Sequence, residues 1–404
     1  RLMAQSQRVV LFSGGTAVNS FAEIFTEHDD IHISFILPVT DDGGSSGVIR
    51  RVLGGPGIGD VRSRLMRLSC PEEQRSPSDQ AVHLLLAHRL PLDEDEAVRE
   101  WRAVLSGDDP RWRDVDAAHK CTIRRFLQFF QDCIAETSAP FSFSGGSLGN
   151  FFFTGTRLFF GSLDAAIFWY SKVHQIPDSV RVVPCVVEEA AALQLVARLQ
   201  DGTLIRGQNE ISHPGAVVQK DTTLGLGSPI QDICIHRDDI PVTVPANPTA
   251  LDLLVNSTAI VYGAGSLFTS ILACLAFQGV GEVIADKDTR KTLLLNSRPD
   301  RETAGMTATD YVQAIARCLN RVNQPTPIPT PLPPSRFVSE VIAVRGSGVL
   351  ASGDEQRLAD LGIQLIMVDG RDGNFDLANI LPALSLRGSD VSFATGRHGV
   401  PASA

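Results

Sequence analysis

The sequence predicts an α/β fold in which helices cover a mostly parallel sheet. Its first part reads strand, loop, helix, because an apolar run at residues 9–12 leads through a glycine turn into a helical stripe at residues 18–25. A second apolar run at residues 31–39 ends in a glycine- and serine-rich loop, and a further strand, loop and helix occupy residues 258–277. Parallel strands need crossover connections, which are usually helices, so this alternation favours a parallel sheet.

The middle of the chain departs from this alternation in two places. Residues 92–140 are rich in charge and contain a helical stripe from Ile123 to Ile134, which predicts a helical insertion. Residues 182–207 alternate apolar with mostly polar side chains and contain Asp201-Gly202, a dipeptide typical of hairpin turns. We therefore expect a helical insertion followed by a β hairpin.

The C-terminal part returns to strands and helices. Thr307 and Asp310 resemble a capping box that opens a helix, and residues 338–344 and 362–368 are predicted strands. Six prolines within twelve residues indicate a stiff exposed strap. The expected parts are a nucleotide-binding α/β domain at residues 1–323 that includes the insertion at 92–140, the strap at 324–335, and an α/β extension at 336–404 packed on the same domain.

Composition excludes several functional classes. The net charge of −10 argues against a nucleic-acid binder, which needs a basic face to neutralise phosphates. No run of 18 apolar residues is present, so no membrane partner is expected. The seven cysteines form no C-x-x-C pair and the nine histidines no H-E-x-x-H motif, which leaves a zinc site without support and predicts free thiols in the cytoplasm. The chain begins with Arg1, so a targeting peptide cannot be read from it.

Five glycine-rich loops carry the candidate chemistry, and loop one is Ser13-Gly14-Gly15-Thr16. Glycines after a strand let the backbone approach a phosphate, and the following helix N-terminus offers free N–H groups. Gly14, Gly15 and Thr16 are therefore candidate nucleotide-binding residues. The alternative is an ordinary tight turn between a strand and a helix.

Loop two runs from Asp41 to Gly47 directly after the second strand. Its two carboxylates suit a hard cation such as Mg²⁺, and ligands of parallel sheets bind at the carboxyl ends of strands. We predict Asp42 as a catalytic metal ligand. Gly43, Gly44, Ser45 and Ser46 are predicted phosphate contacts. The alternative is a polar turn whose aspartate caps the next helix.

Loop three runs from Gly54 to Asp60 and is followed by Val61-Arg62. Asp60 is a candidate second metal carboxylate, and the planar guanidinium of Arg62 can bind phosphate oxygens in pairs. Taken alone, this loop also fits a glycine-rich connector in which Asp60 caps a helix and pairs with Arg62.

Loop four, Gly145 to Asn150, matches the G-x-S-x-G motif of serine hydrolases at Ser147. A hydrolase also needs a histidine, and the candidates are His174, His213 and His236. The other interpretation is a helix N-terminus with Ser147 as its cap.

Loop five begins with Gly263-Ala264-Gly265-Ser266 and has the same pattern as loop one, small residues between a buried strand and a helix. Gly263, Gly265 and Ser266 are therefore nucleotide-binding candidates. Upstream, Asn247-Pro248 either directs an amide toward a base or sugar, or forms an Asx turn.

Taken together and in this order, the loops resemble those of the CofD superfamily, and within it the YvcK or gluconeogenesis-factor branch. The sequence as a whole is similar to fungal members. The resemblance covers residues 9 to about 320 and implies a Rossmann-like three-layer α/β/α fold. The motifs that carry it are Gly14-Gly15-Thr16, Asp41 to Gly47, Gly59-Asp60-Val61-Arg62, Ser147-Leu148-Gly149-Asn150, Gly263 to Leu267, Asn296, Asp300-Arg301-Glu302-Thr303 and Asp310-Tyr311-Val312. It implies that Ser147, Asn150 and Arg301 belong to the nucleotide pocket.

The resemblance implies two functions. CofD transfers a phospholactyl group from a guanosine diphosphate adduct to a deazaflavin alcohol with Mg²⁺, and the YvcK branch is associated with UDP-sugar binding and control of carbon metabolism. This chain departs from the YvcK pattern because it has Gly146 for His, Ser63 for Asn, Ala264 for Pro and Phe268 for Tyr.

Our prediction from the sequence is a Mg²⁺-dependent transferase that acts on a nucleotide-diphosphate adduct. Asp42 and Asp60 would hold the metal, backbone N–H groups of loops one and two would cradle the diphosphate, and Arg62 would stabilise the leaving group. The alternatives are a non-enzymatic UDP-sugar regulator and a serine hydrolase at Ser147. The expected partner is a small nucleotide or nucleotide sugar, and a homodimer is a candidate assembly.

Overall fold

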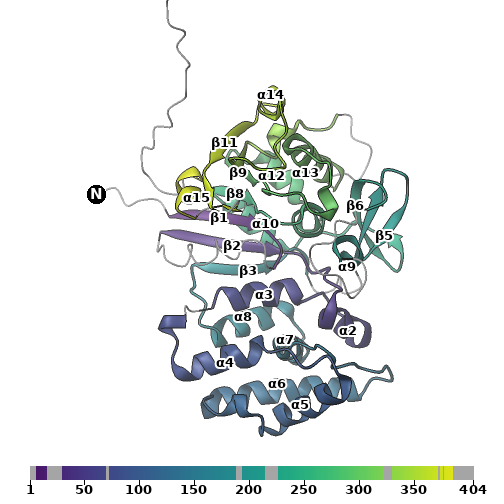
Figure 1. Cartoon of the computed structure of the whole chain (residues 1–404), viewed down its shortest axis with the longest axis vertical. Coiled ribbons are helices and arrows are strands. Elements are labelled where there is room, and N and C mark those ends of the chain that lie inside the picture. Colours follow the sequence, from purple (N-terminus) through teal and green to yellow (C-terminus); the bar gives the residue numbers. More distant parts are fainter. Residues whose placement is uncertain are drawn as a thin grey trace, which may run out of the picture.

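The computed structural model describes residues 6–15, 30–69, 72–187, 193–213, 226–322, 330–371, 374–375 and 377–384. A seven-stranded sheet with the order β11-β10-β9-β8-β1-β2-β3 forms its centre (Figure 1). Every neighbouring pair in this sheet is parallel, which confirms the α/β fold class. The strands are β1 (Gln7–Phe12), β2 (Ile31–Leu37), β3 (Val180–Pro184), β8 (Ala259–Tyr262), β9 (Arg290–Leu294), β10 (Glu340–Val344) and β11 (Gln364–Val368).

The central strands are buried on both faces. From Val9 to Phe12 each side chain of β1 is at most 2% exposed, and Ile33 and Phe35 of β2 are fully buried. Near-continuous apolar runs of this kind are typical of parallel strands covered by helices on both faces. The predicted strands at 338–344 and 362–368 appear as β10 and β11, and they extend this sheet at one edge.

The strand order places a topological switch point between β1 and β8. The chain leaves β1 toward β2 on one side, and β8 pairs with β1 on the other side. The region at the carboxyl ends of these two strands corresponds to the crevice of open α/β sheets. This is the position at which open α/β sheets bind ligands.

A layered helical region lies beyond β3, at the bottom of Figure 1, and is formed by the chain between β2 and β3. The predicted insertion at 92–140 holds α5 and α6, and Trp101 of α5 packs on the rings of Phe130, Phe143 and Phe151. The helices are α2 (Gly44–Leu53), α3 (Gly59–Arg67), α4 (Pro77–Ala87), α5 (Glu94–Ser106), α6 (Ala117–Ala135), α7 (Leu148–Phe160) and α8 (Leu163–Val173), with 3-10 turns at Glu72–Gln74 and Pro110–Trp112.

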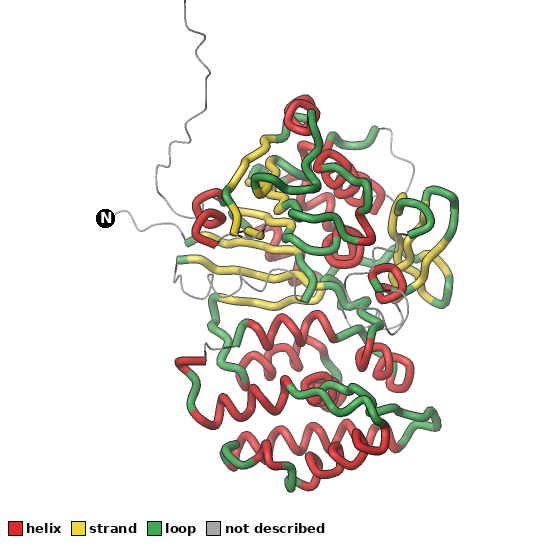
Figure 2. The backbone as a smooth tube through the Cα atoms, in the orientation of Figure 1, coloured by secondary structure: helices red, strands yellow, loops and turns green. Residues whose placement is uncertain are grey.

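A small antiparallel sheet lies beyond the carboxyl ends of the main sheet, beside α9 at the right of Figures 1 and 2. Its order is β5-β4-β6-β7, and the predicted hairpin turn at Asp201-Gly202 joins β4 to β5. Gly202 has a φ of +88°, a conformation that glycine adopts without strain. The elements are β4 (Leu193–Leu199), β5 (Leu204–Arg206), α9 (Gln208–Ser212), β6 (Ile230–Arg237) and β7 (Ile240–Pro241).

The remaining elements cover the main sheet or extend it. The predicted helix after Thr307 is α13, and the Asp310 carboxylate accepts hydrogen bonds from the Thr307 N–H and hydroxyl. These elements are α10 (Pro248–Asn256), the π-helix η4 (Leu267–Leu272), α11 (Ala273–Leu275), α12 (Val280–Asp286), α13 (Ala308–Val322), α14 (Asp354–Asp360), α15 (Leu377–Ala383), β12 (Gly370–Arg371), β13 (Asn374–Phe375) and 3-10 turns at Arg301–Thr303 and Pro334–Arg336.

Some predictions fall outside the described residues. They are Thr16, the helical stripe at 18–25, residues 324–329 of the strap and residues 385–404 of the extension. Within the described part of the chain, no helix is both long and apolar enough to cross a membrane.

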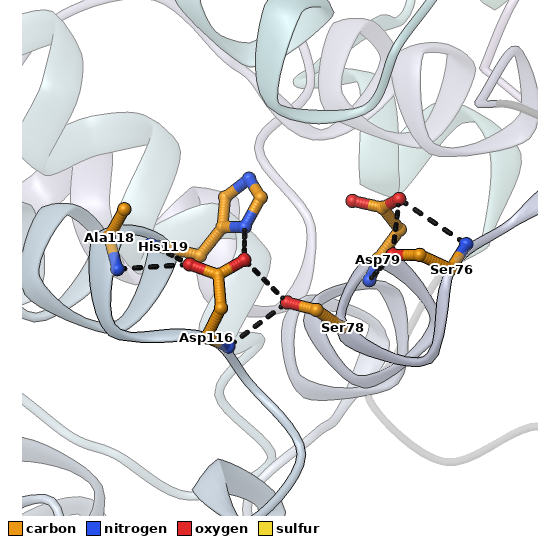
Figure 3. Close-up of polar contacts among 6 residues, drawn as sticks. All are labelled: Ser76, Ser78, Asp79, Asp116, Ala118 and His119. Carbon is orange, nitrogen blue, oxygen red and sulfur yellow. Dashed lines mark hydrogen bonds and ion pairs between the residues drawn. The ribbon is translucent and has the colours of Figure 1, made fainter.

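The N-terminal ends of α4 and α6 are joined by a network of capping hydrogen bonds (Figure 3). The Asp116 carboxylate accepts from the backbone N–H groups of Ala118 and His119 at 2.9 Å and from the Ser78 hydroxyl of α4 at 2.8 Å. Ser76 caps α4 by a reciprocal bond with Asp79. The His119 N–H, the Ser78 hydroxyl and the His119 ring hold the pKa of Asp116 well below its usual range.

We expect Asp116→Ala to lower the melting temperature at neutral pH, because α6 loses its cap and its link to Ser78. A carboxylate with a lowered pKa in the folded state stabilises the fold above its unfolded pKa of about 4, and this stabilisation is lost as pH falls below that value. The difference between variant and wild type should therefore shrink in acid. Thermal melts over pH measure this, and Asp178→Ala, on an exposed pair with Lys172, is the control. Equal melting temperatures at neutral pH would contradict the prediction.

Candidate active site

Loops one and five meet at the switch point between β1 and β8. The Gly263 N–H donates to the Phe12 carbonyl at 2.8 Å, which holds the start of loop five against the end of β1. A β-carbon on Gly14 would lie 2.5 Å from the Ser270 hydroxyl oxygen, so the two loops are in contact there. Gly14 therefore packs closely against the Ser270 side chain at the carboxyl end of β1.

Asp60, in the first turn of α3, lies against loop one. Its Oδ1 accepts from the Gly15 N–H at 2.9 Å, and its Oδ2 accepts from the Gln208 side chain at 3.2 Å. Burial and then the charge of Asp41 raise the pKa of Asp60 to about 6. A β-carbon on Gly15 would lie 2.7 Å from the Asp60 Cα, so glycine allows loop one to approach α3 this closely.

Asp41 is the carboxylate of loop two that acts on Asp60. It accepts from the Gly43 N–H at 3.1 Å and from the Ser46 hydroxyl. Burial raises the pKa of Asp41, and the adjacent Asp42 adds to this rise. A β-carbon on Gly59 would lie 1.9 Å from Asp41 Oδ2, so the Asp41 carboxylate occupies the space that Gly59 leaves free, one residue from Asp60. Two half-buried carboxylates thus lie close enough for the charge of one to raise the pKa of the other.

Asp42, which the sequence suggested as the partner of Asp60, binds α9 in the structure. Its Oδ1 accepts from the Asn209 N–H at 2.8 Å, at the first turn of α9. Gly207 has a φ of +93°, and a β-carbon there would lie 2.3 Å from Asp42 Oδ2. This corresponds to the alternative interpretation of loop two, in which an aspartate caps a helix, although the helix is α9 and not the next one. Asp41 therefore replaces Asp42 beside Asp60.

Asn150 joins loops two, three and four. Its amide donates to the Ser45 hydroxyl at 3.0 Å and to the Ser46 hydroxyl at 3.4 Å, and its carbonyl oxygen accepts from Arg62 Nε at 2.8 Å. The three loops belong to the N-terminal ends of α2, α3 and α7, so three helix N-termini converge on one point. Gly44, with a φ of +46°, starts α2 there.

Ser147 caps α7. Its hydroxyl accepts from the Asn150 N–H at 3.3 Å, and the residue is only 1% exposed. Its φ and ψ of −89° and 120° are ordinary extended values, whereas a nucleophile elbow is strained and exposes its serine. In the part of the chain that the structure describes, no histidine makes a hydrogen bond to Ser147. Burial lowers the pKa of His174 to about 3, and its ring lies on Tyr170. This geometry favours the helix-cap interpretation over the hydrolase.

We expect no labelling of the purified protein at Ser147 by a fluorophosphonate probe, because the hydroxyl is buried and has no base to activate it. Ser147→Ala should instead cost about 1 kcal/mol of folding free energy through the lost cap. Mass spectrometry after labelling and urea unfolding of the variant measure the two effects. Stoichiometric labelling of wild type that disappears in Ser147→Ala would contradict the prediction.

Loop five is held in place by residues from the segment after β9. Asn296 makes two bonds of 2.7 Å to Gly265, donating to its carbonyl and accepting from its N–H. Glu302 accepts from the N–H groups of Phe268 and Thr269 at 3.1 Å and so caps η4. Ser266 precedes η4 and makes no capping bond with its side chain. The side chain of Ser266 therefore takes no part in holding the end of η4.

Arg301 and Asn247 both bind backbone carbonyl groups. Arg301 donates to the carbonyls of Glu210 and Ile211 at the end of α9. Asn247 accepts from the Thr249 N–H at 2.9 Å, which is an Asx turn, and donates to the Pro184 carbonyl at the end of β3. Asn247 is 1% exposed. The geometry favours the Asx-turn interpretation of Asn247. Arg301 contacts the backbone of α9 from the segment after β9.

Three residues of the site were not singled out from the sequence. Gln208 accepts from the Thr40 hydroxyl at 2.8 Å while it donates to Asp60, and α9 supplies it from far along the chain. Asp41 and Glu302 lie within motifs that the sequence indicated, but the predicted site residues of those motifs were their neighbours Asp42 and Arg301. Among the described residues, no cluster of three or more His, Cys, Asp or Glu side chains is arranged to hold a metal ion.

A family model and several known proteins are similar to this chain over most of its length. The family model described as 2-phospho-L-lactate transferase CofD matches residues 9–359. An uncharacterized protein of Saccharomyces cerevisiae, YNL011C, is 32% identical over 377 residues, which covers 78% of this chain and 83% of the yeast protein. The putative gluconeogenesis factor of Thermotoga maritima is 26% identical over 316 residues and covers 78% of this chain and 76% of its own length.

A solved structure shares the fold. The crystal structure of a UPF0052 family member from Bacillus halodurans has a TM-score of 0.64 to this chain at 22% identity. The match covers 94% of this chain and 99% of that protein.

Proposed function

The chain belongs to the CofD family, and on this basis we propose that it binds a nucleoside-diphosphate derivative with Mg²⁺ in the crevice between β1 and β8. The proposal includes transfer of a phosphoryl-linked group from that derivative to an acceptor hydroxyl, as the family description suggests. The resemblance to the gluconeogenesis-factor branch and to a fungal protein is confirmed by the relatives.

The observation that carries this proposal is the half-buried pair Asp41 and Asp60. Two neighbouring carboxylates with raised pKa values repel each other, and a divalent cation is the partner that offsets this repulsion. Mg²⁺ is usually held by one or two carboxylates together with the phosphates of the substrate. Asp41 and Asp60 fit that pattern, and the metal when bound would neutralise the diphosphate.

The diphosphate would lie on backbone N–H groups. Gly14 and Gly15 leave loop one free of side chains, and the first turn of α2 begins at Gly44 without a side-chain cap at Gly43. Free N–H groups and the helix dipole favour phosphate at such a helix end. Ser45 stands in the same turn and is a further donor, whereas the Ser46 hydroxyl donates to Asp41.

In the proposed transfer, the acceptor hydroxyl oxygen forms a bond to the phosphorus and its proton passes to water, while the bond from that phosphorus to its bridging oxygen breaks. The nucleotide leaves with the bridging oxygen and its electron pair. Arg62, placed by its bond to Asn150, would stabilise negative charge on the reacting phosphate. Loops one and three would keep the diphosphate and the acceptor in one line.

The second candidate function is a regulator that binds a UDP-sugar without chemistry. Its support is α9, which contacts loop two through Asn209, Asp60 through Gln208, and Arg301 through its last carbonyls. A ligand bound in the crevice would change the position of the small sheet through these contacts. The gluconeogenesis-factor names of several relatives favour a role of this kind.

Calorimetric titration with GDP and with UDP-N-acetylglucosamine, with and without Mg²⁺, tests the proposal. We expect Mg²⁺-dependent nucleotide binding that is lost in Asp41→Asn and kept in Asp42→Asn, because an asparagine at position 42 still accepts from Asn209. Mg²⁺-independent UDP-sugar binding would favour the regulator and contradict the transferase. The absence of nucleotide binding under all conditions would contradict both.

A further inference from the structure

An aromatic surface is exposed where α6 meets the end of α7, in the helical region farthest from the main sheet (Figure 1). Phe159 and Phe160, the last two residues of α7, are 58% and 45% exposed. Their ring centroids lie 5.2 Å apart, and both rings contact Phe126 of α6. The ring of Phe129 lies 5.5 Å from that of Phe159 and extends the cluster along α6. Single exposed apolar side chains are ordinary, but a contiguous aromatic surface marks an interaction site.

The same surface contains a hollow of about 430 Å³. Phe129, Phe159 and Trp169 of α8 contribute its aromatic lining, and the charged residues Arg125 and Asp132 of α6 line it as well. An exposed aromatic side chain beside a hollow is a shape that can fit a second copy of itself across a twofold axis.

The charges on this face of α6 are arranged symmetrically. Arg125 and Asp132 are seven residues apart, so they lie on one face of the helix about two turns apart. Arg125 comes three residues before Gln128, and Asp132 comes three residues after Phe129. Both charged side chains are exposed, and neither forms an ion pair with a described residue. A twofold axis that crosses α6 between Gln128 and Phe129 therefore brings Arg125 of each copy opposite Asp132 of the other.

This arrangement favours a second copy over other occupants. A surface that binds an anionic membrane carries cations around its aromatic side chains. Here the aromatic centre is flanked by one charge of each sign, and the chain as a whole has a net charge of −10. Opposite charges at matched positions fix the partner and the orientation of paired helices.

We propose that this face binds a second copy of the chain through an antiparallel contact of α6 with α6, centred on Gln128 and Phe129. Two ion pairs form across the contact, each between Arg125 of one copy and Asp132 of the other. The aromatic side chains of Phe129 and Phe159 are buried in both copies, which supplies the apolar centre of the interface.

The proposed contact lies away from the crevice. Asn150, in the first turn of α7, joins the loops of the candidate site, whereas Phe159 lies in the last turn of the same helix. The two ends of α7 thus serve different surfaces. The inference does not rest on the proposed nucleotide binding, and either can fail without the other.

Sedimentation velocity of the full chain measures the assembly. We expect a monomer–dimer equilibrium with a dissociation constant in the micromolar range, roughly 1 to 100 μM. Phe159→Ser should raise this constant at least about tenfold, because it removes an aromatic side chain from the interface centre. Arg125→Asp and Asp132→Arg should each raise it at least about tenfold, because each reversal places like charges opposite each other at two positions.

Mixing the two charge-reversal variants gives the sharpest test. An equimolar mixture of Arg125→Asp with Asp132→Arg should form a heterodimer about as stable as the wild-type dimer. The new carboxylate of one chain then faces the new guanidinium of the other, and the unchanged Asp132 and Arg125 of the two chains pair as before. This recovery also shows that both variants are folded.

The control is Arg345→Asp, which reverses an exposed arginine after β10, a strand near the far edge of the main sheet, and should leave the dimer unchanged. A wild-type chain that stays monomeric at about 100 μM would overturn the inference. So would a dimer that tolerates Phe159→Ser and both charge reversals, because its interface would then lie elsewhere. Failure of the mixed reversal variants to associate would overturn the antiparallel contact.

Discussion

Asp60→Asn should make the metal-free protein more stable at neutral pH and remove its stabilisation by Mg²⁺. The pKa of Asp60 in the folded protein is about 6, above the usual 3.8 of an aspartate, chiefly because of burial and then the charge of Asp41. The folded state therefore binds a proton more tightly than the unfolded state. Stability falls as pH rises from about 4 to about 6, and the full penalty is present above that range.

The size of this effect has an upper limit. A shift of about two pKa units corresponds to about 3 kcal/mol of folding free energy at neutral pH. An asparagine cannot ionise, so the variant avoids the penalty and keeps the acceptor for the Gly15 N–H. Loss of the carboxylate also removes one of the two proposed Mg²⁺ ligands.

Urea unfolding between about pH 4 and pH 8 measures the pH dependence in the presence of a chelator. We expect the variant to gain stability relative to wild type as pH rises, with the two curves meeting near pH 4. Added Mg²⁺ should raise the melting temperature of wild type only, because ligand binding to the folded state stabilises it by mass action. Parallel curves, or equal stabilisation by Mg²⁺, would contradict the role given to Asp60. Asp178→Asn, on an exposed pair, is the control.

Gly57→Ala should destabilise the protein by about 3 kcal/mol or more and displace Asp41 from Asp60. A β-carbon on Gly57 would lie 2.1 Å from the Asp41 carbonyl oxygen and 2.5 Å from the Asp41 nitrogen. Both atoms are backbone, so no side chain can rotate away. The Gly57 N–H also donates to the Val39 carbonyl at 2.7 Å, and the methyl group would force this bond apart.

The matched control is Gly227→Ala, where a β-carbon would meet no atom within 4 Å. Chemical unfolding of both variants should show a large loss for Gly57→Ala and a change within about 0.5 kcal/mol for Gly227→Ala. Nucleotide titration of Gly57→Ala should show weaker Mg²⁺-dependent binding even where the variant is folded. A stability equal to that of wild type would mean that the loops separate more easily than the structure indicates.

The sequence by itself determined the parallel sheet and the positions of the candidate loops. Apolar runs such as residues 9–12 and 259–262 form buried strands, and the glycines after them break each strand at its carboxyl end. These are local properties, since the pattern and the turn lie within a few residues of each other. The order of these loops and of the motifs after them also indicated the family, because each motif keeps its local residues.

The tertiary structure alone decided which side chains of those loops share the crevice. Asp41 and Asp42 are adjacent in the chain, and only the free space at Gly59 and at Gly207 directs one carboxylate toward Asp60 and the other to α9. Gln208 comes from α9, and Asn150 joins three helix ends that lie far apart in sequence. The pairing of β1 with β8 is equally non-local, since about 250 residues separate them. The direction of a side chain depends on the space that its distant neighbours leave, and that space exists only once the chain has folded.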